Sequence, residues 1–192
     1  WSNAFSPWSL QPALKANMPV LRRADRLRRS LVPSLLGARR TNETLANATI
    51  ELLEIAKAYL PSDTPGALPQ EPLFLSLTSG QDFRTVKGVI EAVVSSLNSK
   101  LELTVKPFEH AMLLSGRACE LWLQSPGTQA QLLGYLGEVS SEGLRMFELR
   151  GSATVAELRI ETLMELTNLV PQYSPLPVFP AVTRDLNFVV EE

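Results

Sequence analysis

A strict alternation of side-chain character in three short segments constrains this chain's fold more than any other pattern. Residues 156–161 show it most cleanly, because Ala, Leu and Ile alternate there with Glu, Arg and Glu. Residues 73–78 and 101–106 follow the same period of two. Such a period places alternate side chains on opposite faces of a β-strand, so each segment is predicted to be a strand with one face against a core.

Other segments add a hairpin and helices. The turn pair Pro126-Gly127 separates residues 118–124 from residues 131–139, and this spacing predicts two strands joined in a hairpin. Residues 83–97 carry apolar side chains at helical spacing, which predicts an amphipathic helix. Residues 161–170 predict a further short helix.

The segment from Ser30 to Leu60 predicts a helix followed by a strand. Ser30 stands where a helix cap is expected and Pro33 lies in the first turn, where a missing N–H matters least. Asn47 is the expected stop. The apolar run Ile50–Leu60 is predicted to be a buried strand.

Proline-rich stretches separate these elements. Residues 61–72 and 171–180 each hold four prolines, which predicts a surface loop and a linker. One more strand is expected to begin at residues 186–190. Hairpins with segregated helices predict an α+β domain, an antiparallel sheet flanked by helices. With 192 residues the chain has the size of about one domain.

Composition excludes several classes of protein. Hydrophobic residues make up 45% and charged residues 20% of the chain, values that exclude a disordered sequence. No apolar run approaches the ~20 residues of a membrane helix, so no membrane span is expected. The single Cys119 cannot form an internal disulfide or a multi-cysteine zinc site, which favours a reducing, cytoplasmic setting.

Positive charge is concentrated near the N-terminus. Seven arginines and one acid, Asp25, lie between Leu21 and Arg40, although the whole chain has a net charge of −2. Such a stretch is either a basic contact surface or an arginine-rich helix face with acidic partners in the same chain.

Few residues offer catalytic chemistry. His110 is the only histidine and is expected to be structural, and Cys119, inside a predicted strand, is expected to be a buried, unreactive thiol. Gly134 and Gly137 are better explained by close packing than by phosphate binding. The acidic pairs Glu51/Glu54 and Glu157/Glu161 are expected to have ordinary surface roles.

Seven stretches, in this order along residues 27–190, together resemble the beta subunit of bacterial phenylalanyl-tRNA synthetase. They share a succession of short motifs with that family, in which Ala56, Ser140 and Ser141 depart from the usual residues. The stretches are L-R-R-S-L-V-P-S-L-L at 27–36, L-E-I-A-K-A-Y at 53–59, D-F with V-K-G-V-I-E at 82–91, His110 with S-G-R-A at 115–118, G-Y-L-G-E-V at 134–139, A-E-L at 156–158 and F-P-A-V-T-R-D-L at 179–186.

The resemblance implies a class II aminoacyl-tRNA synthetase-like antiparallel sheet flanked by helices. Residues 1–178 would be the catalytic-like core domain of the beta subunit. Residues 179–192 would be a linker and the first strand of a truncated, ferredoxin-like anticodon-binding domain.

The resemblance also implies that this domain is not itself catalytic. Working class II synthetases hold ATP with an arginine in an F-R-x-E motif and another after a glycine-rich strand. Here Val86 stands where the glutamate of that motif belongs, after Phe83-Arg84, and no G-x-G-x-G-x-x-x-R occurs. No catalytic, cofactor-binding or metal-binding residues are therefore expected in this chain, whereas the whole enzyme uses ATP and Mg²⁺.

The implied role is assembly with the catalytic alpha subunit, which supports charging of tRNA(Phe) with phenylalanine. The helix-plus-strand unit at residues 30–60 would pair with that subunit, with Leu35, Leu36, Arg39 and Arg40 as interface candidates. Leu35 and Leu36 are equally compatible with a place in this domain's own core. Contacts with tRNA(Phe) are expected mainly through other domains, and a homodimer is possible for the isolated chain.

Two alternatives remain open. The chain could be a divergent class II ligase-like enzyme with a remodelled pocket, or its arginine-rich stretch could be a basic tRNA-binding module.

Overall fold

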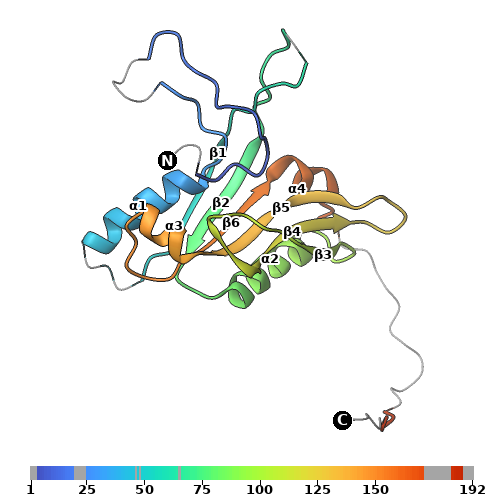
Figure 1. Cartoon of the computed structure of the whole chain (residues 1–192). Helices are drawn as coiled ribbons and strands as arrows, with labels where there is room; N and C mark the ends of the chain where they lie inside the picture. Colours follow the sequence, from blue (N-terminus) through green and yellow to red (C-terminus); the bar gives the residue numbers. More distant parts are fainter. Residues whose placement is uncertain are drawn as a thin grey trace.

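A computed structural model describes residues 4–19, 25–45, 47, 49–64, 66–170 and 183–187 (Figure 1). Ten helices and strands follow one another in these residues. In chain order they are α1 (Val32–Thr44), β1 (Leu52–Lys57), β2 (Leu73–Ser79), α2 (Phe83–Leu97), β3 (Glu102–Pro107), β4 (Leu113–Gln124), β5 (Gln131–Val139), α3 (Ser141–Met146), β6 (Thr154–Arg159) and α4 (Ile160–Leu166).

The six strands form one antiparallel sheet in the order β1-β2-β6-β5-β4-β3. Strands β1 and β2 form one ribbon, and β3, β4 and β5 form another. Strand β6 lies between the two ribbons and pairs with β2 on one side and β5 on the other. The predicted α+β class with an antiparallel sheet is confirmed.

One face of the sheet packs against α2 and α4 through aliphatic side chains. Val86, Ile90 and Val94 of α2 lie against Leu121 of β4 and Leu136 of β5. Helix α2 has the predicted bounds. Its apolar residues recur every three or four positions and therefore form a single buried stripe.

The opposite face packs against α1, α3 and an N-terminal segment, which we define as residues 4–13. Phe5 of this segment is buried with Val32 and Leu36 of α1 and with Val155 of β6. Figure 1 shows α1 and α3 on the side of the sheet away from α2. The short helix α3 was not expected from the sequence.

The N-cap of helix α1 lies one residue after the predicted cap, Ser30. Leu31 occupies the N-cap position without a side-chain hydrogen bond, and Pro33 lies in the first turn as expected. The Ser30 hydroxyl instead accepts a hydrogen bond from the Val32 N–H and donates one to the carboxylate of Glu157 in β6. The helix ends at Thr44, three residues before Asn47.

The prediction of a buried strand at Ile50–Leu60 is correct for the strand and wrong for its burial. Strand β1 is an edge strand, and its side chains alternate between half-buried and exposed. The apolar run resembles that of a central strand because both faces of β1 carry aliphatic residues, but only one of the two faces is covered.

Little of the predicted C-terminal region falls within the described residues. The linker at 171–180 and residues 188–190 of the expected strand lie outside them. Residues 183–187 are described and contain neither helix nor strand. The domain boundary at residues 178/179 stays a prediction.

Candidate functional site

Glu157 lies at the centre of the sheet and is completely buried, with 0% of its surface exposed. Its carboxylate accepts a hydrogen bond of 2.7 Å from the Ser30 hydroxyl and one of 3.2 Å from the Leu31 N–H. These groups stand at the N-terminal end of α1, so Glu157 caps the helix from a distant strand. The predicted surface role of Glu157 is therefore wrong, because the N-terminal segment and α1 cover the face onto which its side chain projects.

The environment of Glu157 favours its protonated form. Burial raises the pKa of this carboxyl to about 7, although the hydrogen bonds from Ser30 and Leu31 oppose the shift. Ser76 and Trp8 also face the carboxylate. The Ser76 hydroxyl and the Trp8 indole N–H are buried without regular hydrogen-bond geometry.

Aromatic side chains surround this carboxylate. The Trp8 indole stacks on the Phe74 ring with centroids 4.6 Å apart, and the Tyr135 ring meets it edge-on at 4.9 Å. The Arg159 guanidinium lies 5.1 Å from the indole centroid. Burial raises the pKa of the Tyr135 hydroxyl, which favours its neutral form.

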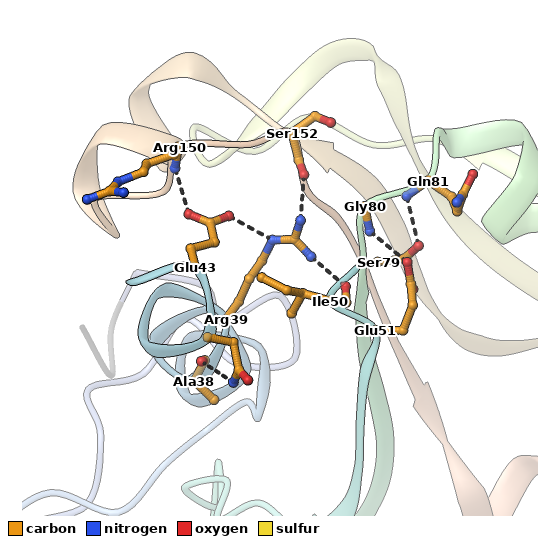
Figure 2. Close-up of polar contacts among 11 residues, drawn as sticks. Ala38, Arg39, Glu43, Ile50, Glu51, Ser79, Gly80, Gln81, Arg150 and Ser152 are labelled. Carbon is orange, nitrogen blue, oxygen red and sulfur yellow. Dashed lines mark hydrogen bonds and ion pairs between the residues drawn. The ribbon is translucent and has the colours of Figure 1, made fainter. Parts of the chain in front are cut away.

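A second polar cluster surrounds Arg39, one of the predicted interface residues. Figure 2 shows its guanidinium between the end of α1 and two loops. It donates to the backbone oxygens of Ile50 and Ser152 at 2.8 and 3.0 Å and pairs with Glu43 at 3.4 Å. Glu43 also accepts a hydrogen bond from the Arg150 N–H. Arg39 thus joins the end of α1 to two loops of the fold through a nearly buried side chain.

A cavity of about 490 Å³ opens beside this cluster. Its charged lining residues are balanced, because Arg39 and Arg150 face Glu43 and Glu51. No group of three or more His, Cys, Asp or Glu side chains suited to a metal ion occurs in the described part of the chain.

The other predicted interface residues lie close to Arg39 on α1. Leu35 and Leu36 are both buried in this chain, and Leu36 belongs to the core beneath the N-terminal segment. Arg40 is partly exposed and pairs with Glu148. The interface role of Leu35, Leu36, Arg39 and Arg40 stays a prediction.

The sequence-based reasoning missed a surface that the same helix-plus-strand unit exposes. Leu53 and Ile55 of the edge strand β1 are 60% and 53% exposed. A groove of about 250 Å³ separates β1 from α2 and is lined mainly by aliphatic side chains, among them Leu53, Leu77 and Val89. Leu53 and Ile55 share one face of β1 with the charged Lys57, and this shared face was the available signal.

Most of the described arginines in the basic stretch have partners within the chain. Arg28 pairs with Glu54 at 3.0 Å, and Arg29 donates to the Ser9 backbone oxygen. Arg39 pairs with Glu43 and Arg40 pairs with Glu148. Arg26 is exposed. Arg22 and Arg23 lie outside the described residues. These contacts favour the interpretation that the stretch is held by intramolecular partners.

The histidine and the cysteine occupy structural positions. The Nδ1 atom of His110 accepts a hydrogen bond from the Met112 N–H, and the ring packs edge-on against Phe5. Burial lowers the pKa of His110 and therefore favours the neutral ring. Burial raises the pKa of the Cys119 thiol to about 11, as expected of an unreactive thiol.

The residues that resemble catalytic motifs do not meet at one site. Phe83 and Arg84 begin α2, on the opposite face of the sheet from Glu157. Gly134 lies where β5 passes close to β6, and an added Cβ would stand 2.0 Å from the Glu157 backbone oxygen. Close packing therefore accounts for this glycine, as the sequence predicted.

The fold is that of the catalytic domain of class II aminoacyl-tRNA synthetases. The chain superimposes on the structure of Desulfitobacterium hafniense PylSc, a pyrrolysyl tRNA synthetase, with a TM-score of 0.51 at 15% sequence identity. The match covers 71% of this chain and 47% of that chain. At this identity the likeness concerns the fold alone.

The family follows from sequence similarity. Residues 6–160 match the model of the phenylalanyl tRNA synthetase beta chain CLM domain, where CLM denotes catalytic-like. Among curated relatives, phenylalanine–tRNA ligase beta subunits from Rhodopirellula baltica and Moorella thermoacetica are 38% and 32% identical over 98% and 96% of this chain. The chain belongs to this family of catalytic-like domains.

The match extends over only part of those relatives. The chain spans 28% of the Rhodopirellula protein and 23% of the Moorella protein. The family match confirms, for this domain, the resemblance inferred from the seven motifs.

Proposed function

We propose that this domain is a non-catalytic assembly module of phenylalanyl-tRNA synthetase. It pairs with the catalytic alpha subunit and thereby supports the charging of tRNA(Phe) with phenylalanine. The family supports the pairing. The observation that carries the proposal is the uncovered aliphatic surface on β1, since Leu53 and Ile55 are more than half exposed on an edge strand.

Edge strands with exposed aliphatic side chains are unfavourable in water. An unpaired edge presents free backbone N–H and C=O groups, and the aliphatic side chains add apolar surface next to them. The groove between β1 and α2 extends this surface across Val89. A stable interface buries about 1,000 Å² or more, so a partner has to contact both the strand and its surroundings.

Chemistry and RNA binding are assigned to other parts of the enzyme. ATP and Mg²⁺ bind the alpha subunit in this proposal, because this chain lacks the arginine motifs that hold ATP. Contacts with tRNA(Phe) come mainly from other domains. The described residues contain no helix able to cross a membrane. The cytoplasm is the location that the family suggests for this proposal.

Size-exclusion chromatography with light scattering tests the pairing. The chain is mixed with the matching alpha subunit, once as wild type and once with Leu53→Asp and Ile55→Asp. The wild type is expected to form a mixed complex that the double variant loses. Val105→Asp is the matched control, because Val105 is 45% exposed on the opposite edge strand, β3.

Each outcome bears on the proposal. If the double variant folds and still binds the alpha subunit, β1 is not the contact surface. If the wild type elutes only as a homodimer, the exposed edge pairs with a second copy instead. Phenylalanine-dependent ATP–pyrophosphate exchange by the isolated chain is expected to stay at background, and clear exchange would favour the ligase-like alternative.

A further inference from the structure

The face of the sheet beneath the N-terminal segment has the side chains of a small-molecule site. Cross-strand neighbours Phe74 and Arg159 form its floor, and Tyr135 pairs with Glu157 in the adjoining row. The site therefore combines aromatic surface, a cation and a buried carboxylate. Ligand sites are typically apolar and aromatic recesses with a few convergent polar groups of this kind.

The polar atoms of this recess are incompletely satisfied by the protein. The Ser76 hydroxyl, the Arg159 Nε and the Trp8 Nε1 are buried without regular hydrogen bonds. Buried polar groups are almost always hydrogen-bonded in folded proteins. Apart from Trp8 itself, the recess thus holds two such atoms, the Ser76 hydroxyl facing the Glu157 carboxyl and the Arg159 Nε beside the indole, and its polar chemistry exceeds what the present packing uses.

The chain's own Trp8 fills the recess. Its indole lies over Phe74 and Arg159, and its N–H faces the Glu157 carboxylate, although regular hydrogen-bond geometry is not reached. The indole thus stacks on Phe74, meets Tyr135 edge-on and faces the Glu157 carboxyl, as a bound aromatic ligand would. It also borders an open cavity of about 350 Å³, lined by Leu60, Gln70 and Arg159 among others.

Residues 6–12 around Trp8 form neither helix nor strand. The Arg29 guanidinium holds them by donating to the backbone oxygens of Ser9 and Gln11. The Tyr135 hydroxyl donates to the Pro7 backbone oxygen at 3.4 Å. The indole is therefore held over the recess by a segment of irregular backbone.

We propose that this recess is a binding site for planar, fused-ring heteroaromatic compounds with an N–H donor, and that Trp8 occupies it as a built-in ligand. The N-terminal segment then competes within the chain against any free ligand of this class. The site is closed while Trp8 is in place and accepts a ligand once the ring is removed. This inference does not depend on the proposed assembly with the alpha subunit.

Chemical rescue with indole tests the proposal. Trp8→Gly deletes the ring and leaves the Phe74 and Tyr135 rings and the Glu157 carboxyl in place to receive indole. Indole at about tenfold excess over its Kd is expected to raise the unfolding midpoint of this variant by about 3 °C or more, and to leave the wild type unchanged. Benzofuran has the same shape without the N–H and is expected to bind about tenfold more weakly.

Trp122→Gly is the matched control. Trp122 lies on β4 beneath the Lys106 ammonium and donates to Glu120, on a part of the sheet that stays half-exposed. Its removal opens a surface instead of a recess, so indole is expected to leave this variant unchanged. A midpoint shift of equal size in both variants would overturn the proposal, because it would show binding of indole to exposed surface in general.

Indole binding can also be tested if Trp8→Gly does not fold in the absence of indole. Indole is then expected to restore the near-ultraviolet circular dichroism of the folded chain, which benzofuran restores less well. Absence of any response to indole, in a folded or an unfolded Trp8→Gly, overturns the proposal. Equal responses to indole and benzofuran overturn the assigned role of the N–H donor.

Discussion

The two faces of the sheet are packed by different kinds of side chain. Beneath α2 and α4 the contacts are aliphatic, with Leu121 and Ile90 almost wholly buried. Beneath the N-terminal segment the core includes aromatic rings and the buried Glu157. Burial raises the pKa of Cys119 on the first face to about 11, far from neutral pH, whereas burial raises the pKa of Glu157 on the second face to about 7. We therefore expect the packing of the first face to be insensitive to pH near neutrality and that of the second face to depend on it.

The largest expected effect is at Gly134, where the strands β5 and β6 are closest. In Gly134→Ala the new Cβ would stand 2.0 Å from the Glu157 backbone oxygen, so the two strands have to separate and both faces are disrupted. We expect a loss of roughly 4 kcal/mol or more in urea unfolding, or no folded protein. Gly88→Ala is the control, because an added Cβ there meets nothing within 4 Å. A mild effect at Gly134 would mean that β5 and β6 pair less closely.

On the aliphatic face, Leu121→Ala is expected to lower the free energy of unfolding by about 2–5 kcal/mol. Leu121 has 0% of its surface exposed and lies among other aliphatic side chains. The loss is expected to be the same at pH 5 and pH 8, measured by urea unfolding at both values. A loss that changed strongly with pH would contradict the contrast between the two faces.

On the other face, Glu157→Gln tests the dependence on protonation. The folded-state pKa of Glu157 is about 7, above its ordinary value of 4.5, so folding favours the protonated carboxyl. This contribution is complete below pH 4.5 and is lost as the pH rises to about 7. Between pH 4.5 and pH 7 the free energy of unfolding of the wild type is therefore expected to fall by roughly 3 kcal/mol relative to that of Glu157→Gln. Urea unfolding of both proteins across this pH range measures the difference. Parallel stability curves for the two proteins would show that Glu157 does not titrate in this range.

The smallest effect is expected at the cap of α3. The Ser140 hydroxyl accepts a hydrogen bond of 3.1 Å from the Gly143 N–H and donates one of 3.0 Å to the Ala111 backbone oxygen. Ser140→Ala removes both and is expected to lower the free energy of unfolding by about 1 kcal/mol. The neighbouring Ser141→Ala should change it little, because Ser141 is exposed in the first turn. Equal losses in the two variants would contradict the capping role.

The regular elements could be predicted from the sequence because their signals are local. The stripe of residues 83–97 and the turn at Pro126-Gly127 specify α2 and the β4–β5 hairpin without reference to the rest of the chain. Helix α3 was missed because it spans only six residues. The edge position of β1 could not be predicted, because strand order depends on pairings between residues far apart in the sequence.

The candidate site was predictable only in part. Alternation correctly places Glu157 and Leu158 on opposite faces of β6, yet it cannot show that both faces are covered. Part of the cover is the N-terminal segment, which has irregular structure and therefore no periodic signal. Trp8 could be assigned to the recess only after its contacts with Phe74 and Tyr135 were seen.

The position of β6 has a consequence for the order in which the chain folds. The two ribbons on either side of it can form from neighbouring segments, but they share no strand pairing until β6 enters between them. The contact of Leu77 with Ala156 closes a loop of about eighty residues, an entropic barrier that slows folding. During synthesis on a ribosome the sheet can therefore be completed only after residue 159 has emerged, and until then each ribbon exposes an open edge to other chains.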